Sequence, residues 1–364
     1  MISKLNYFTG NLVYQLLNAA KNYMTSLAGK KLLVAPLDWG LGHAIRCVPL
    51  ISDLLNNDCE VWLAGEGAQE KLLREEFPSL SFLPLKGYRI KYAKKGLTAK
   101  ILLQIPSILS SIKEENKWLK DQVGKFGFEA VISDNRYGLY HEKIFSVFIT
   151  HQLCIRSFLG KWSEKIVQKW NYKFINRFNE CWIPDEKGED NLAGELSHPV
   201  KMPLIPTKYI GSLSRLEKKD VDESKNHLLI ILSGPEPQRT ILENKVIDQI
   251  VNYPATATIV RGLPGEKNII PSTNTIHFYN HLSSEELNSE AMKAEFIVSR
   301  SGYSTVMDIA ALKKKSILIP TPGQTEQEYL ADYLMKKQLS FCVKQNKFSL
   351  LENIQEAKRF EYRF

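Results

Sequence analysis

The sequence predicts an α/β protein made of two doubly wound, Rossmann-like domains that face a shared cleft. Its 364 residues exceed the roughly 250–300 at which a single core stops growing. Short apolar runs alternate with helical patterns, which is typical of parallel sheets covered on both faces. This alternation breaks once, in the charged segment 213–226, and then restarts.

Four apolar runs in the first half predict buried strands: Lys31–Leu37, Glu60–Ala64, Glu129–Ser133 and Phe145–Thr150. After the charged segment, further strands are expected at His227–Leu232, Thr256–Val260, Glu295–Val298 and Ser316–Pro320, with helices at Ile241–Val251 and Thr305–Leu312. We therefore divide the chain into an extension (1–28), a first domain (29–212), a linker (213–226), a second domain (227–350) and a tail (351–364). Ligands of such folds bind at the carboxyl ends of the strands.

The composition narrows the class of protein. Hydrophobic residues make up 44% and charged residues 24%, as in an ordinary globular protein, which argues against disorder. The five cysteines are scattered, so a disulfide framework or zinc site is not expected, and a reducing cytoplasm is favoured. No apolar run approaches the ~18 residues that span a bilayer. The net charge of +8 favours anionic surfaces, but no nucleic-acid-binding motif is present.

The first thirty residues contain no acidic residue, and polar residues interrupt their apolar face. A signal peptide would have an uninterrupted apolar stretch. Four interpretations stay open: a helix packed on the body, a disordered leader, a true start at Met24, or membrane contact.

A glycine-rich turn follows the first predicted strand and reads Gly40-Leu41-Gly42-His43. Such a turn lets backbone N–H groups approach an oxyanion closely. Ile45 replaces the third glycine of a dinucleotide fingerprint, so a nicotinamide or flavin cofactor is disfavoured. The imidazole of His43 is placed at the mouth of the cleft and is the predicted general base. Asp134, which ends a strand beside Asn135, is the second candidate.

The second domain carries a similar turn, Ser299-Arg300-Ser301-Gly302, which runs from a strand into a helix. Small residues at a helix start suit a diphosphate. Thr305 belongs to the same helix start, and the carboxylate of Asp308 can point back to the mouth and suits ribose hydroxyls.

Two other loops complete the predicted donor side. One follows the next strand and offers Gln324 and Gln327 to sugar hydroxyls, and the other is Ser233-Gly234 after the first strand of the second domain. Either loop could be an ordinary surface turn.

The turns at Ser299–Gly302 and Gln324–Gln327, about twenty residues apart, resemble the donor site of glycosyltransferase family 28, which has the GT-B fold. The resemblance implies that Ser299–Gly302 receives the nucleotide and that Asp308, where the family usually has Glu, holds the ribose. It also implies sugar contacts from Gln327, although the family's second Gln is Glu328 here.

The same resemblance extends to the first domain. The Gly40–His43 turn resembles the family's glycine loop, whose His is a proposed base. Thr150-His151-Gln152 resembles a second acceptor-side loop of the family, with its His in a similar place. The predicted acceptor side consists of Gly40, Gly42, Asn135, His151 and Gln152.

We therefore predict an inverting transferase that moves a hexose or N-acetylhexosamine from a UDP-sugar to a hydroxyl of an acceptor glycan or lipid-linked glycan in cell-envelope polysaccharide synthesis. The UDP-sugar is a substrate, and neither a cofactor nor a metal is expected. Asp220-Val221-Asp222 resembles a metal-binding DxD but lies in the linker, so it is interpreted as solvated.

Two alternatives stay open. The GxGHxxR motif at residues 40–46 also resembles that of a nucleotide-sugar hydrolase of nonulosonic-acid precursor synthesis. Such an enzyme would release nucleotide without an acceptor. A sensor would bind without turnover.

A basic segment predicts peripheral contact with the inner face of the cell membrane. Six cations and two tyrosines fall within residues 86–100, which contain no acid: Lys86, Arg89, Lys91, Lys94, Lys95, Lys100, Tyr88 and Tyr92. The apolar stretch Ile101–Ile112 follows directly, as in interfacial segments. The alternative is a solvated loop that leads into a core helix.

Overall fold

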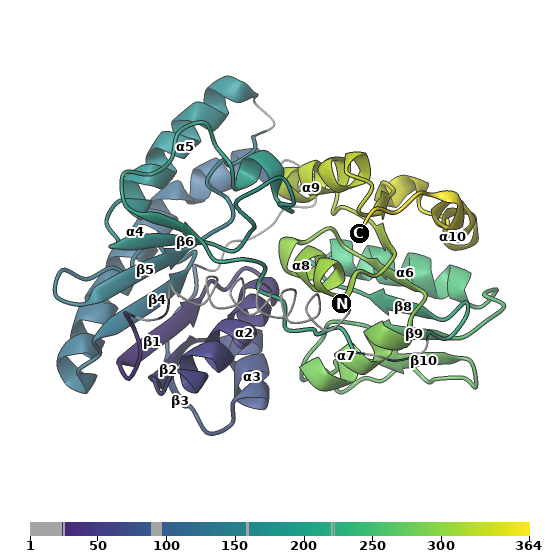
Figure 1. The fold of residues 1–364 in the computed structure, drawn as a ribbon, viewed down its shortest axis with the longest axis horizontal. Coiled ribbons are helices and arrows are strands. Elements are labelled where there is room, and N and C mark those ends of the chain that lie inside the picture. The colour runs from purple at the N-terminus through teal and green to yellow at the C-terminus, as the bar shows by residue number, and fades with distance from the viewer. Residues whose placement is uncertain (1–23, 25, 89–96, 158–159, 220, 222) are drawn as a thin grey trace, which may run out of the picture.

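The computed structural model describes residues 24, 26–88, 97–157, 160–219, 221 and 223–364. Within these residues the chain forms two separate parallel sheets, one on each side of the molecule in Figure 1. Helices cover both sheets, so the architecture is the predicted pair of doubly wound α/β units.

The first sheet has seven strands in the order β3-β2-β1-β4-β5-β6-β7. Their bounds are β1 Lys31–Pro36, β2 Glu60–Gly65, β3 Ser81–Pro84, β4 Ala130–Asp134, β5 Phe145–Ile149, β6 Glu180–Ile183 and β7 Thr207–Tyr209. The associated helices are α2 Gly42–Asn56, α3 Gly67–Glu76, α4 Leu97–Phe126, α5 Lys161–Ile175 and the 3-10 helix η1 Gly194–Leu196. All four predicted strands are present, and β3, β6 and β7 were not predicted.

The second sheet has six strands in the order β10-β9-β8-β11-β12-β13. Their bounds are β8 Leu228–Ile231, β9 Ala257–Val260, β10 Ile276–Tyr279, β11 Phe296–Ser299, β12 Ser316–Leu318 and β13 Phe341–Cys342. The helices are α6 Gln238–Ile250, α7 Ser284–Lys293, α8 Tyr303–Leu312, α9 Thr325–Lys336, η2 Gln345–Lys347 and α10 Leu350–Arg359.

The expectation of a C-terminal tail at 351–364 is wrong for most of that segment. Helix α10 packs Leu350, Ile354 and Ala357 into the core of the second sheet. These residues are spaced by four and three positions, which places them on one helical face. Tyr362 then donates its hydroxyl to the carbonyl of Ser316 at 2.9 Å.

The linker is likewise more than a solvated connection. Leu213 and Leu216 are buried in the same core cluster as Met307 of α8. The charged stretch therefore begins with two residues that attach it to the second domain.

The topology brings one turn of each domain together. Each sheet reverses its strand order between two neighbouring strands, β1 and β4 in the first and β8 and β11 in the second, and ligands of such folds bind at this switch point. The turn after β1 leads into α2, and the turn after β11 leads into α8. These two turns touch, because Ser304 donates its hydroxyl to the carbonyl of Gly42 at 2.7 Å.

Candidate active site

The start of α2 places two basic side chains toward the end of β4. Gly40 has φ +76°, a left-handed conformation that glycine adopts without strain. His43 and Arg46 lie one helical turn apart and share a face. Because β1 and β4 pair with Pro36 opposite Asp134, the carboxylate of Asp134 lies beside this face.

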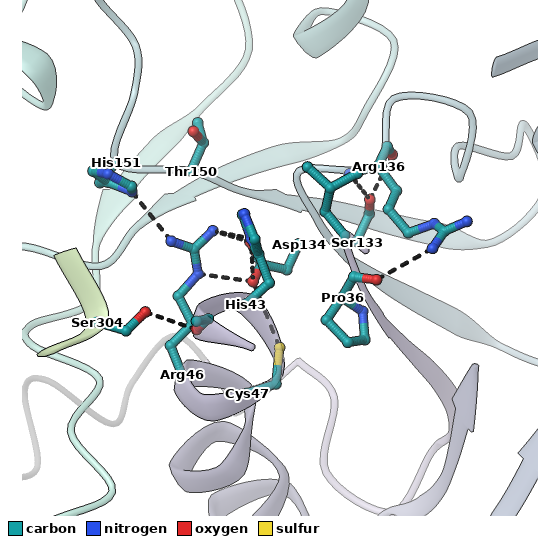
Figure 2. Close-up of polar contacts among 12 residues, drawn as sticks. Pro36, His43, Arg46, Cys47, Ser133, Asp134, Arg136, Thr150, His151 and Ser304 are labelled. Carbon is teal, nitrogen blue, oxygen red and sulfur yellow. Dashed lines mark hydrogen bonds and ion pairs between the residues drawn. The ribbon is translucent and has the colours of Figure 1, made fainter. Parts of the chain in front are cut away.

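Figure 2 shows the resulting cluster of His43, Arg46 and Asp134. Nδ1 of His43 lies 3.2 Å from Oδ2 of Asp134. Arg46 holds both oxygens of the same carboxylate, with Nε 2.7 Å from Oδ2 and Nη2 on Oδ1. The thiol of Cys47 also points at Oδ2, at 3.7 Å.

These contacts set the charge state of the cluster. Burial would raise the pKa of Asp134, but Arg46 and His43 outweigh it and hold that pKa well below its usual range. Burial, followed by the Arg46 cation, lowers the pKa of His43 below its usual value. His43 is therefore neutral at pH 7, as a general base must be. Asp134 has the contacts of a partner to His43 and Arg46 rather than of a free base.

His151 lies between the domains. Its Nδ1 is 3.2 Å from Nη1 of Arg46, and its Nε2 is 2.7 Å from Oε1 of Glu326 in the first turn of α9. The ring stacks on Tyr303 of α8 with centroids 4.0 Å apart. Both ring nitrogens of His151 are engaged, so the predicted acceptor-side residue is here an interdomain contact.

The remaining acceptor-side residues form the loops around this cluster. Asn135 is buried with φ +58°, and its N–H donates to the carbonyl of Ile149 at 3.1 Å. Gln152 is half-buried, and its N–H donates to the hydroxyl of Thr150 at 3.0 Å. A side chain at Gly42 would meet Ser304 Oγ at 3.2 Å, so a small residue suits this crossing point.

Across the cleft, the predicted donor turn is compact. Ser299 donates to the carbonyl of Arg300 at 3.1 Å, and Ser301 donates to the carbonyl of Gln327 at 2.8 Å. Gly302 is the N-cap of α8, and Thr305 is half-buried in the first turn. The serine hydroxyls hold the turn itself, which leaves the backbone N–H groups of the helix start for an anion.

Behind this turn lies a buried cation without a carboxylate partner among the described residues. Arg300 donates to the carbonyls of Gln238 at 2.7 Å and of Ile319 at 3.3 Å, and its Nε has no hydrogen-bond partner. Burial lowers its pKa to about 10, so it stays charged at pH 7.

Thr321 also has a buried polar atom without a hydrogen-bond partner in the described part of the chain, its hydroxyl Oγ1. Both atoms face Gly234, where an added Cβ would lie 3.5 Å from Thr321 Oγ1 and 3.9 Å from Arg300 Nε. Gly234 has φ +104° and follows the half-buried Ser233. The predicted Ser233-Gly234 loop thus borders two polar groups that lack partners.

The structure gives Asp308 a different role from the predicted one. Its Oδ1 accepts hydrogen bonds from the hydroxyl of Ser214 at 2.9 Å and from the N–H of Arg215 at 3.2 Å. Burial raises its pKa in spite of these contacts. Its carboxylate ties α8 to the linker instead of standing free for ribose hydroxyls, because the linker packs against that face of α8.

Gln324 and Gln327, the two predicted sugar-binding glutamines, have different environments. Gln327 is buried and accepts the N–H of Thr321 at 2.9 Å, so it braces the loop. Gln324 is the half-buried N-cap of α9.

Sequence reasoning assigned no role to Arg46, Glu326 or Thr321. The spacing of three between His43 and Arg46 was a usable signal, because it places both on one helical face. Glu326 gave no local signal, since its partner His151 lies 175 residues away. Thr321 gave none, because its hydroxyl has no partner among the described residues.

Some predictions fall outside the described residues. Asp220 and Asp222 of the DxD lie there, as do residues 89–96 of the basic segment and the side chain of Lys100. Tyr88 is buried and donates its hydroxyl to Glu115 at 2.8 Å. Among the residues that the structure describes, no three His, Cys, Asp or Glu side chains are grouped to hold a metal, and no helix has the length and apolarity to cross a bilayer.

Solved structures share this architecture. The kitacinnamycin glycotransferase superimposes with a TM-score of 0.62 at 10% identity, over 91% of this chain and 90% of the other. MurG of Acinetobacter baumannii gives 0.52 at 13% identity, over 91% of each chain. The two facing α/β units are therefore those of the GT-B fold.

The sequence comparisons add the family. Residues 268–361 match the glycosyltransferase family 28 C-terminal domain. A relative from Haemophilus ducreyi is 22% identical over 88% of this chain and 86% of its own length; it is named UDP-N-acetylglucosamine–N-acetylmuramyl-(pentapeptide) pyrophosphoryl-undecaprenol N-acetylglucosamine transferase. An uncharacterised glycosyltransferase of Methanosarcina acetivorans is 22% identical over 82% of this chain and 81% of its own length. The chain is a glycosyltransferase of the GT-B type whose residues 268–361 match the family 28 C-terminal domain, and these relatives lend no support to the hydrolase interpretation.

Proposed function

We propose that the chain is an inverting transferase that moves a hexose or N-acetylhexosamine from a UDP-sugar to an acceptor hydroxyl. The observation that carries this proposal is the His43–Asp134 pair, which lies beside the contact between the start of α2 and the donor turn. Hydrogen bonds from Ser304 to the carbonyl of Gly42 and between His151 and Glu326 join the two domains there. A neutral imidazole beside a buried carboxylate is suited to proton abstraction.

In the proposed reaction His43 donates Nδ1–H to Asp134 and receives the proton of the acceptor hydroxyl at Nε2. The acceptor oxygen forms a bond to the anomeric carbon while the bond from that carbon to the diphosphate oxygen breaks. The electron pair leaves with UDP. Attack from the face opposite the leaving group inverts the anomeric configuration. Asp134 stabilises the imidazolium that forms.

The departing diphosphate would lie against the second domain. Backbone N–H groups at the start of α8 and at the Ser233-Gly234 loop can receive its oxygens. The unpartnered Nε of Arg300 and hydroxyl of Thr321 support this placement, since a buried donor without a partner costs free energy that a bound anion would recover. The charge compensation in this proposal needs no metal ion.

A panel of nucleoside diphosphates and their sugars tests the donor assignment. UDP or a UDP-sugar at about 100 times its Kd is expected to stabilise the fold by roughly 2.7 kcal/mol. Absence of any melting shift would refute the donor site. Nucleotide released at the same rate with and without acceptors would indicate hydrolysis instead of transfer.

We further propose a lipid-linked acceptor and peripheral contact with the inner face of the cell membrane. The names of the Haemophilus ducreyi and Clostridium perfringens relatives specify a pyrophosphoryl-undecaprenol acceptor. In this structure the supporting surface is α5, at the outer edge of the first domain (Figure 1).

Helix α5 exposes an apolar stripe beside a basic one. Trp162, Ile166 and Trp170 are 76%, 41% and 53% exposed, and their spacing of four places them on one face. Four exposed lysines have the same spacing: Lys161, Lys165, Lys169 and Lys173. Tryptophans with flanking lysines are typical of helices that lie in a membrane interface.

A basic pocket is lined mainly by α4, with Arg177 entering it from two positions beyond the end of α5. It has a volume of about 330 Å³ and is lined by Lys113, Lys117, Lys120 and Arg177, together with Ile112, Asn116 and Tyr140. No carboxylate lines it, so lipid phosphates would be favourable there.

Co-sedimentation with anionic vesicles tests this contact. Trp162→Ser/Trp170→Ser is expected to lower partitioning by more than tenfold, because each buried aromatic contributes about 1.5–3 kcal/mol. Ile241→Ser/Val251→Ser, which removes exposed apolar residues of the second domain, is the control. Equal partitioning of wild type and the Trp variant would rule α5 out.

A further inference from the structure

The guanidinium of Arg46 contacts both histidines of the site. Nη2 lies 2.8 Å from Nδ1 of His43, and Nη1 lies 3.2 Å from Nδ1 of His151 (Figure 2). A guanidinium has only N–H donors, so Nδ1 of each ring must accept. A neutral imidazole that accepts at Nδ1 carries its proton on Nε2. The geometry therefore assigns the Nε2–H tautomer to both rings.

For His151 this tautomer satisfies every contact. Its Nε2–H donates to Oε1 of Glu326 at 2.7 Å. Burial would raise the pKa of Glu326, but the contact with His151 outweighs it and lowers that pKa, so the carboxylate is a charged acceptor. Tyr303 fixes the plane of the His151 ring by stacking. Since Glu326 and Tyr303 belong to α9 and α8, the second domain determines how His151 holds Arg46.

For His43 the same tautomer blocks catalysis. A proton on Nε2 leaves no lone pair there to accept the proton of an acceptor hydroxyl. Oδ2 of Asp134 lies 3.2 Å from Nδ1, so the productive tautomer, with Nδ1–H donating to Asp134, becomes favourable once Nη2 of Arg46 moves away. The position of Arg46 thus selects between an idle and a competent base.

The contacts that hold Arg46 adjoin the candidate donor turns. Tyr303 follows Gly302 directly, and Glu326 precedes Gln327, whose amide oxygen accepts the N–H of Thr321. A nucleotide sugar seated on these turns would lie against the first turns of α8 and α9. A displacement of either turn would act on His151 first and on Arg46 next.

We propose that Glu326 is a positioning residue that controls the tautomer of His43 through His151 and Arg46. This inference rests on the proposed function, in which His43 is the base. With the relay intact, His43 holds its proton on Nε2 and is idle. When a bound donor weakens the relay, Nη2 leaves Nδ1, the Nε2 proton passes to solvent, and Nδ1 takes up a proton and donates to Asp134. The base becomes competent only with a donor in place.

The ¹⁵N chemical shifts of labelled histidine report each tautomer directly, with His43→Gln and His151→Gln to assign the signals. In wild type without nucleotide, both rings are expected in the Nε2–H form. Glu326→Ala is expected to shift the His43 ratio toward Nδ1–H by about tenfold, the change for losing one hydrogen bond of ordinary strength. Saturating UDP is expected to shift wild type in the same direction.

Two variants separate the relay from a structural effect. Glu326→Gln keeps an oxygen that accepts from His151 and is expected to match wild type. Asp332→Ala changes an exposed acid farther along α9 and should also match it. An Nδ1–H signal for His43 in ligand-free wild type, or identical ratios in wild type and Glu326→Ala, would overturn the relay. The tautomer is read without turnover, so a shifted ratio in an inactive protein would contradict the proposed transferase instead.

Discussion

The two sides of the cleft differ in how completely their polar groups are paired. On the first domain, the carboxylate of Asp134 has hydrogen-bonding partners at both oxygens, and Arg46 contacts both His43 and His151. On the second domain, Arg300 Nε and Thr321 Oγ1 are buried without partners. The charged groups of the first side are already paired before any ligand arrives, and only the tautomer of His43 has still to change. The second side is incomplete until an anion binds. Substitutions on the first side should therefore reduce turnover or stability, and substitutions on the second should reduce affinity.

The largest effect is expected from His43→Gln. Loss of the general base should lower turnover by about 10²–10⁴-fold and leave nucleotide affinity nearly unchanged. Steady-state rates and calorimetric Kd values on the same preparation measure both. Near-normal turnover would show that the paired cluster is structural.

Asp134→Ala tests how far the first side depends on its carboxylate. The variant leaves the buried Arg46 cation without its charge partner, and such a loss typically costs 3–5 kcal/mol of unfolding free energy. Chemical denaturation measures this. A loss below about 1 kcal/mol, the size of a surface pair, would contradict the pairing described above.

Asp308→Ala is expected to cost about 1–3 kcal/mol of unfolding free energy, because Ser214 and the Arg215 N–H lose a buried acceptor. Nucleotide affinity should change less than stability. A large loss of affinity at unchanged stability would restore the sequence-based assignment to the ribose.

Thr321→Val on the second domain is expected to have the opposite effect to Asp308→Ala, with affinity lost and stability kept. The hydroxyl that it removes has no partner in the described structure, so stability should change by less than about 0.5 kcal/mol. Affinity for UDP should fall by about 0.5–1.5 kcal/mol, the value of one hydrogen bond. A loss of stability without a loss of affinity would show that the Thr321 hydroxyl stabilises the fold and does not serve a ligand.

The smallest effect concerns pH. The folded pKa of His43 is lower than its unfolded value, so the unfolded chain binds more protons in the window between them. Stability should therefore fall as pH decreases below about 6.5, the unfolded His value. Unfolding free energies of wild type and His43→Gln, measured at pH 7 and pH 5, should show a smaller slope in the variant, where His281 and His141 still contribute.

The sequence predicted the sheets better than the contacts between domains. Apolar runs such as Lys31–Leu37 are local signals and gave the correct strands. Edge strands β3 and β13 are short and half-buried, so they carry little apolar pattern. The tail was misread because Leu350, Ile354 and Ala357 form an apolar stripe whose partner surface lies elsewhere in the chain.

In the site, too, features with a local sequence signal were predicted, and features that depend on distant contacts were not. The turns at Gly40–His43 and Ser299–Gly302 were visible because glycine and small residues mark a strand-to-helix turn. The orientation of Asp308 was not visible, because its partners Ser214 and Arg215 lie more than ninety residues away. The pairing of Arg46 with Asp134 likewise spans 88 residues and depends on the register of β1 and β4.

The stereochemistry of the reaction tests the central claim most directly. A proton-abstracting His43 across from the donor implies a single displacement, so the first-formed product should have the anomeric configuration opposite to that of the UDP-sugar. Proton NMR of the product, with water as acceptor if no glycan is used and read before mutarotation, gives the answer. An inverted anomer would support His43 as the base that activates the acceptor. A retained anomer would contradict the account.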